Sequence, residues 1–392
     1  MGRARRRQLG GVDRLPSGRW RVRLADPVSG ARVSMGTYPS KSAAEVAFAQ
    51  AVSDQQRGAW VAPDKGRVTL ADYAGSWLDT RLTSRGEPLR PRTKELYEGF
   101  LRLHILPAFG AQPLARLNTA AVRAWHAALL VNGPGASTAA KCYRLLRTIL
   151  NTAMEDGLLA ANPCNVKGAG MEPCEERQPP SITEVYALAG AVDPRFRCLV
   201  LMAAFAGLRR GELFALTRRD VDLLHRTVDV HRQRQDMRGG GQLVGPPKTE
   251  AGRRTVALPA GLVPDVEAHL SRWCGTDADS PVFPGYKGGP LRVSVWQPEW
   301  TRARRSLGLD HVHLHDLRHV AGTMAAATGA STKELMYRLG HASPRAALRY
   351  QHATAERDGA IAEGINRLIE AARAASSAAV VNLARTAAEA VE

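Results

Sequence analysis

Cysteine is scarce in this sequence: there are five in 392 residues, widely scattered, and none forms a CxxC pair. An odd and scattered set does not build a disulfide framework, and it lacks the spacing of zinc-binding cysteines. We therefore predict reduced, mostly buried thiols and neither a metal nor another cofactor. The five residues are Cys142, Cys164, Cys174, Cys198 and Cys274.

Long apolar runs are also missing. No stretch approaches the roughly 18 to 20 residues that a membrane-spanning helix needs. The arginines within residues 1–7 are not followed by the apolar core of a signal peptide. We expect a cytoplasmic protein with no membrane partner.

Acidic residues are outnumbered, 37 against 54 Lys and Arg, which leaves a formal charge of +17. A charge of this size favours a polyanionic partner, and nucleic acid is the commonest one. A GC-rich genome also produces an arginine-rich and alanine-rich chain, so the charge is weak evidence when taken alone.

The segment 1–62 has the pattern of a small sheet followed by a helix. Trp20, Val22 and Leu24 alternate with arginines, which places apolar groups on one face of a strand and guanidinium groups on the other. Ser40 is a candidate N-cap for the helix. We predict a three-stranded sheet plus one helix that enters a DNA groove; a merely solvated basic face is an equal alternative. The arginines concerned are Arg19, Arg21 and Arg23.

Helical spacing dominates residues 66–165, where Thr93 is expected to begin one helix and Ser137 or Thr138 another. The second helix repeats cations at i, i+3 and i+6, a pattern that suits phosphate contacts but is more often only solvated. These cations are Lys141, Arg144 and Arg147. A connector rich in Pro and Gly follows, and we place a third, mixed α+β domain at 175–375 with a flexible tail at 376–392.

Candidate chemistry in the third domain begins with Arg209, which follows Gly207 at the expected start of a helix. A guanidinium beside helix N–H groups makes an anion site, although a structural ion pair with Glu212 is the better explanation when this segment is taken alone. Residues 227–235 and 253–259 are predicted to form the two strands of a hairpin. Lys248 lies near its bend, as a general acid or as an ordinary surface charge.

Two further clusters contain histidine, arginine and tyrosine. His315 and Arg318 are three residues apart, so they share a helical face where one phosphate contacts both. His341 follows a helix that ends at Gly340. A short helix beginning after Ser343 is expected to carry Tyr350 among basic neighbours that favour its phenolate. The alternating histidines around His315 could also be structural or bind zinc, but no ligand set is complete.

Together these fragments form an ordered set that resembles the signature of the tyrosine recombinases, the phage integrase type. The set is Arg209 with Gly207 and Glu212, Lys248 in a hairpin, His315 with Arg318, Gly340 with His341, and Tyr350 with His352. The resemblance covers residues 181–369. It also implies that the two preceding segments are arm-type and core-type DNA-binding domains.

The resemblance implies a role for each candidate residue: Arg209 and Arg318 bind the scissile phosphate, Lys248 is the general acid for the leaving 5′-oxygen, His315 is an acid/base, His341 binds phosphate, and Tyr350 is the nucleophile. The expected function is site-specific DNA recombination, the integration and excision of a mobile element, through a 3′-phosphotyrosine intermediate and a Holliday junction. Breaking and remaking one ester conserves bond energy, so the reaction requires no ATP or divalent ion.

Family resemblance further implies double-stranded DNA with attachment sites as the partner, a homotetramer on that DNA, accessory bending or excision factors, and a nucleoid-associated location. The apolar stripe of 361–369 is expected to form a helix that docks on a neighbouring protomer. Two alternatives are open: a resident recombinase that resolves chromosome dimers, and a non-catalytic DNA-binding regulator with the same fold.

Overall fold

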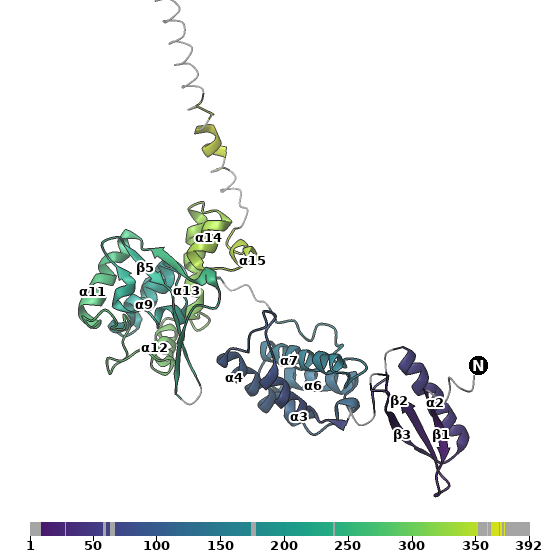
Figure 1. Cartoon of the computed structure of the whole chain (residues 1–392). Coiled ribbons are helices and arrows are strands. Elements are labelled where there is room, and N and C mark those ends of the chain that lie inside the picture. Colours follow the sequence, from purple (N-terminus) through teal and green to yellow (C-terminus); the bar gives the residue numbers. More distant parts are fainter. Residues whose placement is uncertain are drawn as a thin grey trace, which may run out of the picture. The chain divides into compact units, whose positions relative to one another are not determined.

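A computed structural model describes most of the chain: residues 9–27, 29–57, 60–62, 67–173, 178–237, 240–351, 359, 362–367, 369–370 and 372. The chain divides into two compact units, Met1–Glu176 and Arg177–Glu392. Helices form most of the described structure, and its strands form three small sheets (Figure 1). The fold is mainly α with small β-sheets, as the sequence predicted.

An antiparallel sheet and one covering helix lie near the start of the described chain, drawn in purple in Figure 1. Its elements are β1 (Gly10–Arg14), β2 (Trp20–Ala25), β3 (Arg32–Tyr38) and α2 (Lys41–Gln56). Val22 and Leu24 are fully buried, and α2 packs against all three strands. Ser40 Oγ accepts the Ala43 N–H, which confirms the predicted N-cap. The predicted three-stranded sheet plus helix is therefore present.

A helical block follows: α3 (Leu70–Thr80), α4 (Pro91–Phe100), η2 (Leu101–Ile105), α5 (Leu106–Phe109), η3 (Leu114–Arg116), α6 (Thr119–Asn132) and α7 (Ala136–Glu155). Buried residues Tyr143, Leu146 and Leu150 of α7 pack in its core. The expected helix start at Thr93 is wrong, because α4 already begins at Pro91. Proline has the backbone angle and the missing N–H that suit a first helical position.

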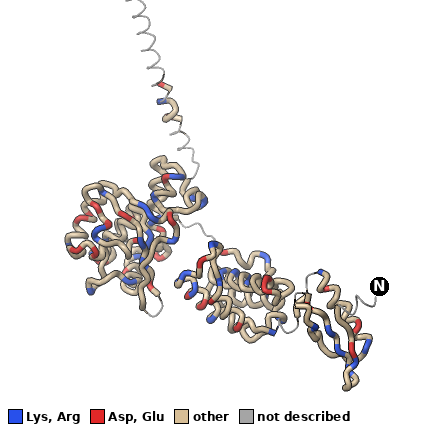
Figure 2. Tube along the Cα trace, viewed as in Figure 1, with Lys and Arg blue, Asp and Glu red and all other residues tan. Residues whose placement is uncertain are grey.

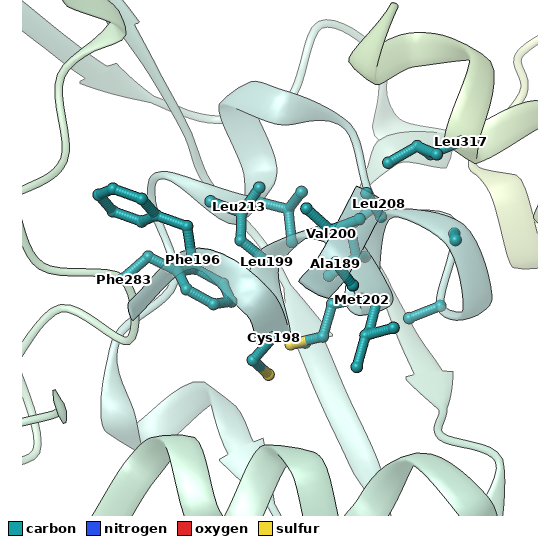
Figure 3. Close-up of a cluster of buried hydrophobic side chains, with 14 of the residues drawn as sticks. Ala189, Phe196, Cys198, Leu199, Val200, Met202, Leu208, Leu213, Phe283 and Leu317 are labelled. Atoms are coloured by element: carbon teal, nitrogen blue, oxygen red, sulfur yellow. The ribbon is translucent and has the colours of Figure 1, made fainter. Parts of the chain in front are cut away.

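The second unit contains α8 (Ile182–Ala191), α9 (Pro194–Phe205), α10 (Arg210–Leu213), α11 (Val263–Trp273), α12 (Val293–Ser306), α13 (Leu314–Ala327), α14 (Thr332–Leu339) and α15 (Pro344–Leu348). Helix α9 contacts α8, α11 and α13, and its Phe196, Leu199 and Met202 are fully buried (Figure 3). A helix that is apolar on every side is stable only inside a core. Helix α9 is therefore the centre on which α13, a main element of the candidate site, is packed.

Two small antiparallel sheets complete this unit: β4 (Val221–Asp222), β5 (Thr227–Val230) and β8 (Arg254–Ala257) form one, and β6 (Gln233–Asp236) and β7 (Gln242–Gly245) the other. The predicted single hairpin is thus only partly right. Strand β5 does pair with the returning β8, but β6 closes first on β7. The Met237 N–H donates to Gly241 O at 2.8 Å, so a local turn forms before the chain returns.

Helix α14 ends at Gly340, whose φ of 61° is the left-handed conformation that glycine adopts without strain. Helix α15 ends at Leu348, so Tyr350 lies in the turn beyond it rather than on the predicted helix. Farther on, Ile365 and Ile369 are exposed. His352, Ile361, Leu368 and the tail 376–392 lie outside the described residues. No described helix has the length and apolar character to cross a membrane.

Candidate active site

Three guanidinium groups from distant parts of the chain meet at the C-terminal end of α14. Arg209, Arg254 and Arg318 donate to the carbonyl oxygens of residues 340, 338 and 339 respectively. The Arg209 Nη2 to Gly340 O distance is 2.7 Å, and the Arg254 Nε to Arg338 O distance is 2.9 Å. The last carbonyls of a helix lack partners within it and carry partial negative charge. This helix end therefore gathers and orients the arginines.

A buried carboxylate fixes two of these arginines. Glu212 accepts from Arg209 Nη1 at 2.7 Å and from Arg254 Nη2 at 3.0 Å. Burial acts to raise the pKa of Glu212, but Arg254 and Arg209 outweigh it, so the pKa is lowered. The ion pair of Arg209 with Glu212, one of the two interpretations of the sequence, is present and lies within the arginine cluster.

Arg318 is almost fully buried, with 1% of its surface exposed. Its Nη1 donates to Gly207 O at 2.6 Å, and its Nη2 to Leu339 O. A guanidinium has five N–H donors, so three are left for an anion. Burial, and then Arg209, lower the pKa of Arg318 to about 9, which still leaves it charged at pH 7.

His315 and His341 stand close to these charges. Burial, followed by His319 and Arg318, lowers the pKa of His315 to about 4, although the residue keeps part of its surface exposed. Burial, followed by Arg318 and Arg209, lowers the pKa of His341 to about 4. Both rings are therefore neutral at pH 7. His341 Nδ1 is buried and makes no hydrogen bond with the described residues.

Tyr350 is 8% exposed and packs on Ala321 and Leu339. Its ring stacks on His341 with centroids 6.2 Å apart, and its Oη lies 2.7 Å from His319 Nδ1. The basic neighbours that the sequence predicted are present, but the ring is buried as a core tyrosine would be, which the sequence did not predict. Burial raises the pKa of Tyr350 and outweighs the opposing effect of Arg318, Arg349 and Arg209.

Lys248 lies in the bend between β7 and the turn η5 (Glu250–Gly252) and is exposed. The chain just after it does reach the site. A Cβ added to Gly340 would lie 2.9 Å from Ala251 O, and η5 contacts α14. The structure thus gathers Arg209, His315, Arg318, His341 and Tyr350, with Lys248 on an adjoining loop.

Sequence reasoning missed two residues of the site. Arg254 falls within a predicted strand that carries no assigned role, yet its side chain is fully buried against Glu212. His319 has no assigned role in the sequence analysis, yet it contacts the Tyr350 hydroxyl. Its spacing of four residues from His315, one helical turn, was the available signal.

The arginines proposed for DNA contact on β2 share a face with an acidic residue. Asp13 lies opposite Arg21 in the sheet register and accepts from Arg23. Arg21 Nη2 is 3.9 Å from the same carboxylate, and Arg19 donates to Thr37 O at 3.0 Å. The face is basic but partly neutralised.

The cations of α7 show the same feature. Lys141 Nζ lies 3.2 Å from Glu172, and Arg144 Nη2 lies 2.5 Å from it, while Arg147 is exposed. Hydrogen bonds from Ser137 and Arg144 hold the pKa of Glu172 at about 2. Lys and Arg occur along each described part of the chain, interleaved with acidic residues (Figure 2). Among the described residues no cluster of His, Cys, Asp or Glu is arranged to hold a metal ion.

Comparison with known proteins agrees with this arrangement. The profile of the phage integrase family matches residues 181–357. The putative prophage phiRv2 integrase of Mycobacterium tuberculosis H37Rv is 34% identical over 377 residues, covering 94% of this chain and 98% of that protein. The integrase of Mycobacterium phage L5 is 32% identical, covering 93% of this chain and 98% of that protein.

Solved structures resemble the fold. The Tn1549 transposon integrase in complex with transposon right end DNA superposes with a TM-score of 0.64 at 20% identity, covering 76% of this chain and 100% of that one. A lambda integrase tetramer bound to a Holliday junction superposes with a TM-score of 0.55 at 18% identity, covering 88% of this chain and 96% of that one.

Proposed function

Because this chain belongs to the phage integrase family of tyrosine-type enzymes, which cleave and rejoin DNA strands in site-specific recombination, we propose that Tyr350 is its nucleophile. The single observation that carries the proposal is the convergence of Arg209, Arg318 and His341 beside the Tyr350 ring. We infer that one phosphate binds the donors that these side chains leave unused.

Charge explains why such a cluster would cleave DNA. Attack on a phosphodiester builds negative charge on its non-bridging oxygens, and fixed guanidiniums stabilise that charge without reorganising. Arg209 and Arg318 are already held by backbone carbonyls, so they remain in place when DNA binds. A bound phosphate would also give the buried His341 nitrogen a partner. The neutral ring would donate an N–H to a phosphate oxygen, either as it stands or after rotating.

The remaining assignments extend this proposal. Lys248, on its exposed bend, protonates the leaving 5′-oxygen, and His315 supplies a hydrogen bond to the phosphate. Residues 1–62, 66–165 and 175–375 serve as arm-type, core-type and catalytic domains. The substrate is double-stranded DNA with attachment sites, on which the chain assembles as a homotetramer. A lambda integrase tetramer on a Holliday junction supports this assembly.

Mobile-element integration is favoured over chromosome-dimer resolution. The phiRv2 prophage and phage L5 integrases match 94% and 93% of this chain, whereas a XerC recombinase of Rhodospirillum centenum matches 72%. An extra DNA-binding segment at the N-terminus suits an enzyme that must hold arm sites as well as core sites.

The test is covalent capture. The protein is incubated with a nicked duplex carrying its attachment site, and protein–DNA adducts are separated on a denaturing gel. Wild type should attach to the 3′-phosphate and release a free 5′-hydroxyl, and Tyr350→Phe should give no adduct because it has no hydroxyl.

Tyr337→Phe is the matched control, because Tyr337 lies on α14 with 62% of its surface exposed. It should form the adduct normally. An adduct with Tyr350→Phe would refute the assignment, and binding without any adduct from wild type would favour a non-catalytic regulator.

A further inference from the structure

His319 contacts the hydroxyl oxygen of Tyr350, the nucleophilic atom of the proposed reaction. It lies on α13, one turn after His315, and its Nδ1 is 2.7 Å from Tyr350 Oη. The two ring centroids are 5.6 Å apart. This is a normal hydrogen-bond distance. The contact joins residues 31 positions apart in the sequence, so packing of the folded protein creates it.

The packing around Tyr350 leaves little freedom for its ring. A Cβ added to Gly322 would lie 2.6 Å from Tyr350 Cζ, so the ring rests directly on the backbone of α13. Ala321 and Leu339 pack against it, and His341 stacks on it. Because Gly322 follows His319 by three residues, the same helical face that receives the ring presents the histidine to its hydroxyl.

The protonation states allow the Tyr350 hydroxyl to be the donor of this hydrogen bond. Burial, followed by Arg349, lowers the pKa of His319, so the ring is neutral at pH 7 and has one nitrogen free to accept. Burial raises the pKa of Tyr350, so the phenol keeps its proton. With the ring proton of His319 on Nε2, the Tyr350 hydroxyl donates to Nδ1, and this is the arrangement on which the inference is built.

Charges face His319 from two elements. On its own helix these are Arg318, Asp316 and the ring of His315, and from the turn after α15 they are Arg349 and Tyr350 itself. The arginines disfavour a second proton on the imidazole, whereas Asp316 favours it. A base with a modest proton affinity returns the proton readily, as a reversible reaction requires.

We propose that His319 is a catalytic residue of strand cleavage, accepting the Tyr350 phenol proton on Nδ1 as Oη bonds to phosphorus. The Oη–P bond forms while the P–O5′ bond breaks. The phenol proton passes to His319, and the 5′-oxygen leaves with a proton from Lys248. Religation reverses each transfer. This inference rests on Tyr350 being the nucleophile, and it leaves His315 as a phosphate ligand rather than the base.

Single-turnover cleavage of the nicked duplex between pH 7 and 9 tests the proposal. His319→Ala and His319→Asn should both cleave about 10²-fold to 10⁴-fold more slowly at pH 7. Their rates should then rise about tenfold per pH unit, because only the spontaneously ionised phenol reacts. Wild type should change little over this range. His311→Asn, an exposed histidine outside the site, is the matched control and should behave as wild type.

The asparagine variant separates proton transfer from positioning. Its side-chain amide can keep a hydrogen bond to Tyr350 but cannot take up the proton. If His319→Asn cleaves at the wild-type rate, His319 only orients the ring and the proposal is wrong. Thermal melting of each variant shows that the fold is retained.

A duplex with sulfur in place of the bridging 5′-oxygen gives the second readout, because a thiolate leaves without a proton. Lys248→Ala should recover on this substrate, whereas the His319 variants should stay slow. Recovery of His319→Ala would place its action at the leaving group and overturn the proposal. Failure of the nucleophile assignment itself is seen separately, as an adduct with Tyr350→Phe.

Discussion

Arg318 of the candidate active site and the cations of α7 are both held by protein acceptors, but the acceptors differ in kind. Arg318 donates to two backbone carbonyls and is almost fully buried. Lys141 and Arg144 instead share the carboxylate of Glu172, whose side chain is 34% exposed. Arg318 is fixed by neutral dipoles, while Glu212 holds its neighbours Arg209 and Arg254, and the α7 cations are neutralised by a surface charge.

This difference decides what each set can offer to a phosphate. Carbonyl dipoles orient a guanidinium without cancelling its charge, and in a site with little water that charge acts strongly on an anion. A carboxylate cancels the charge until it is displaced, and an exposed pair is worth little. The site is therefore organised before DNA binds, whereas α7 must exchange partners.

The largest effect should come from replacing Arg254, which holds Glu212 in the site but is not proposed to bind the phosphate. Arg254→Met leaves Glu212 buried beside Arg209 alone, and loss of one partner of a buried ion pair costs about 3 to 5 kcal/mol of unfolding free energy. Chemical denaturation measures this loss. Arg253→Met, at the exposed neighbouring position, should change stability by less than about 0.5 kcal/mol. Equal effects would mean that the buried pair does not support the fold.

A smaller but more specific effect is expected at Arg318. Lysine keeps the charge but has three donors on a single nitrogen, so Arg318→Lys cannot serve two carbonyls and a phosphate together. Cleavage of the nicked duplex should fall about 10²-fold to 10³-fold, with DNA binding largely retained in a mobility-shift assay. Arg302→Lys, exposed on α12, is the control. Full activity of Arg318→Lys would show that orientation by the carbonyls is unimportant.

Local features of the fold were predictable from the sequence. The alternation of Trp20, Val22 and Leu24 gave the buried face of β2, and the serine before α2 is its N-cap. Gly340 ends α14, as the sequence predicted, and the structure shows that it does so in the left-handed conformation. Each of these depends on a few neighbouring residues, and their physical preferences are visible in the sequence itself.

Long-range packing was not predictable in the same way. The burial of Tyr350 depends on the missing side chain of Gly322, 28 positions earlier, and on Leu339. Arg254 looked like an ordinary strand residue because its partner, Glu212, is far away in the sequence. The ordered motif still located the cluster, since its members were identified by type and order, while their burial and protonation needed the folded structure.

The smallest effect is expected on α7. One substitution there removes the carboxylate that distinguishes its cations from Arg318. Glu172→Gln removes the carboxylate shared by Lys141 and Arg144 and so frees both cations for phosphate contacts. Affinity for DNA should rise several-fold. The slope of log affinity against log salt should steepen by about one to two, because each new phosphate contact releases about one counterion.

Glu155→Gln is the matched control. Glu155 is an exposed glutamate on α7, and its replacement changes the net charge by the same amount. If the two variants raise affinity equally, the gain reflects net charge alone, and the pairing with Glu172 does not restrain these cations. A larger gain and a steeper slope for Glu172→Gln would show that α7 gives up an internal partner in order to bind DNA.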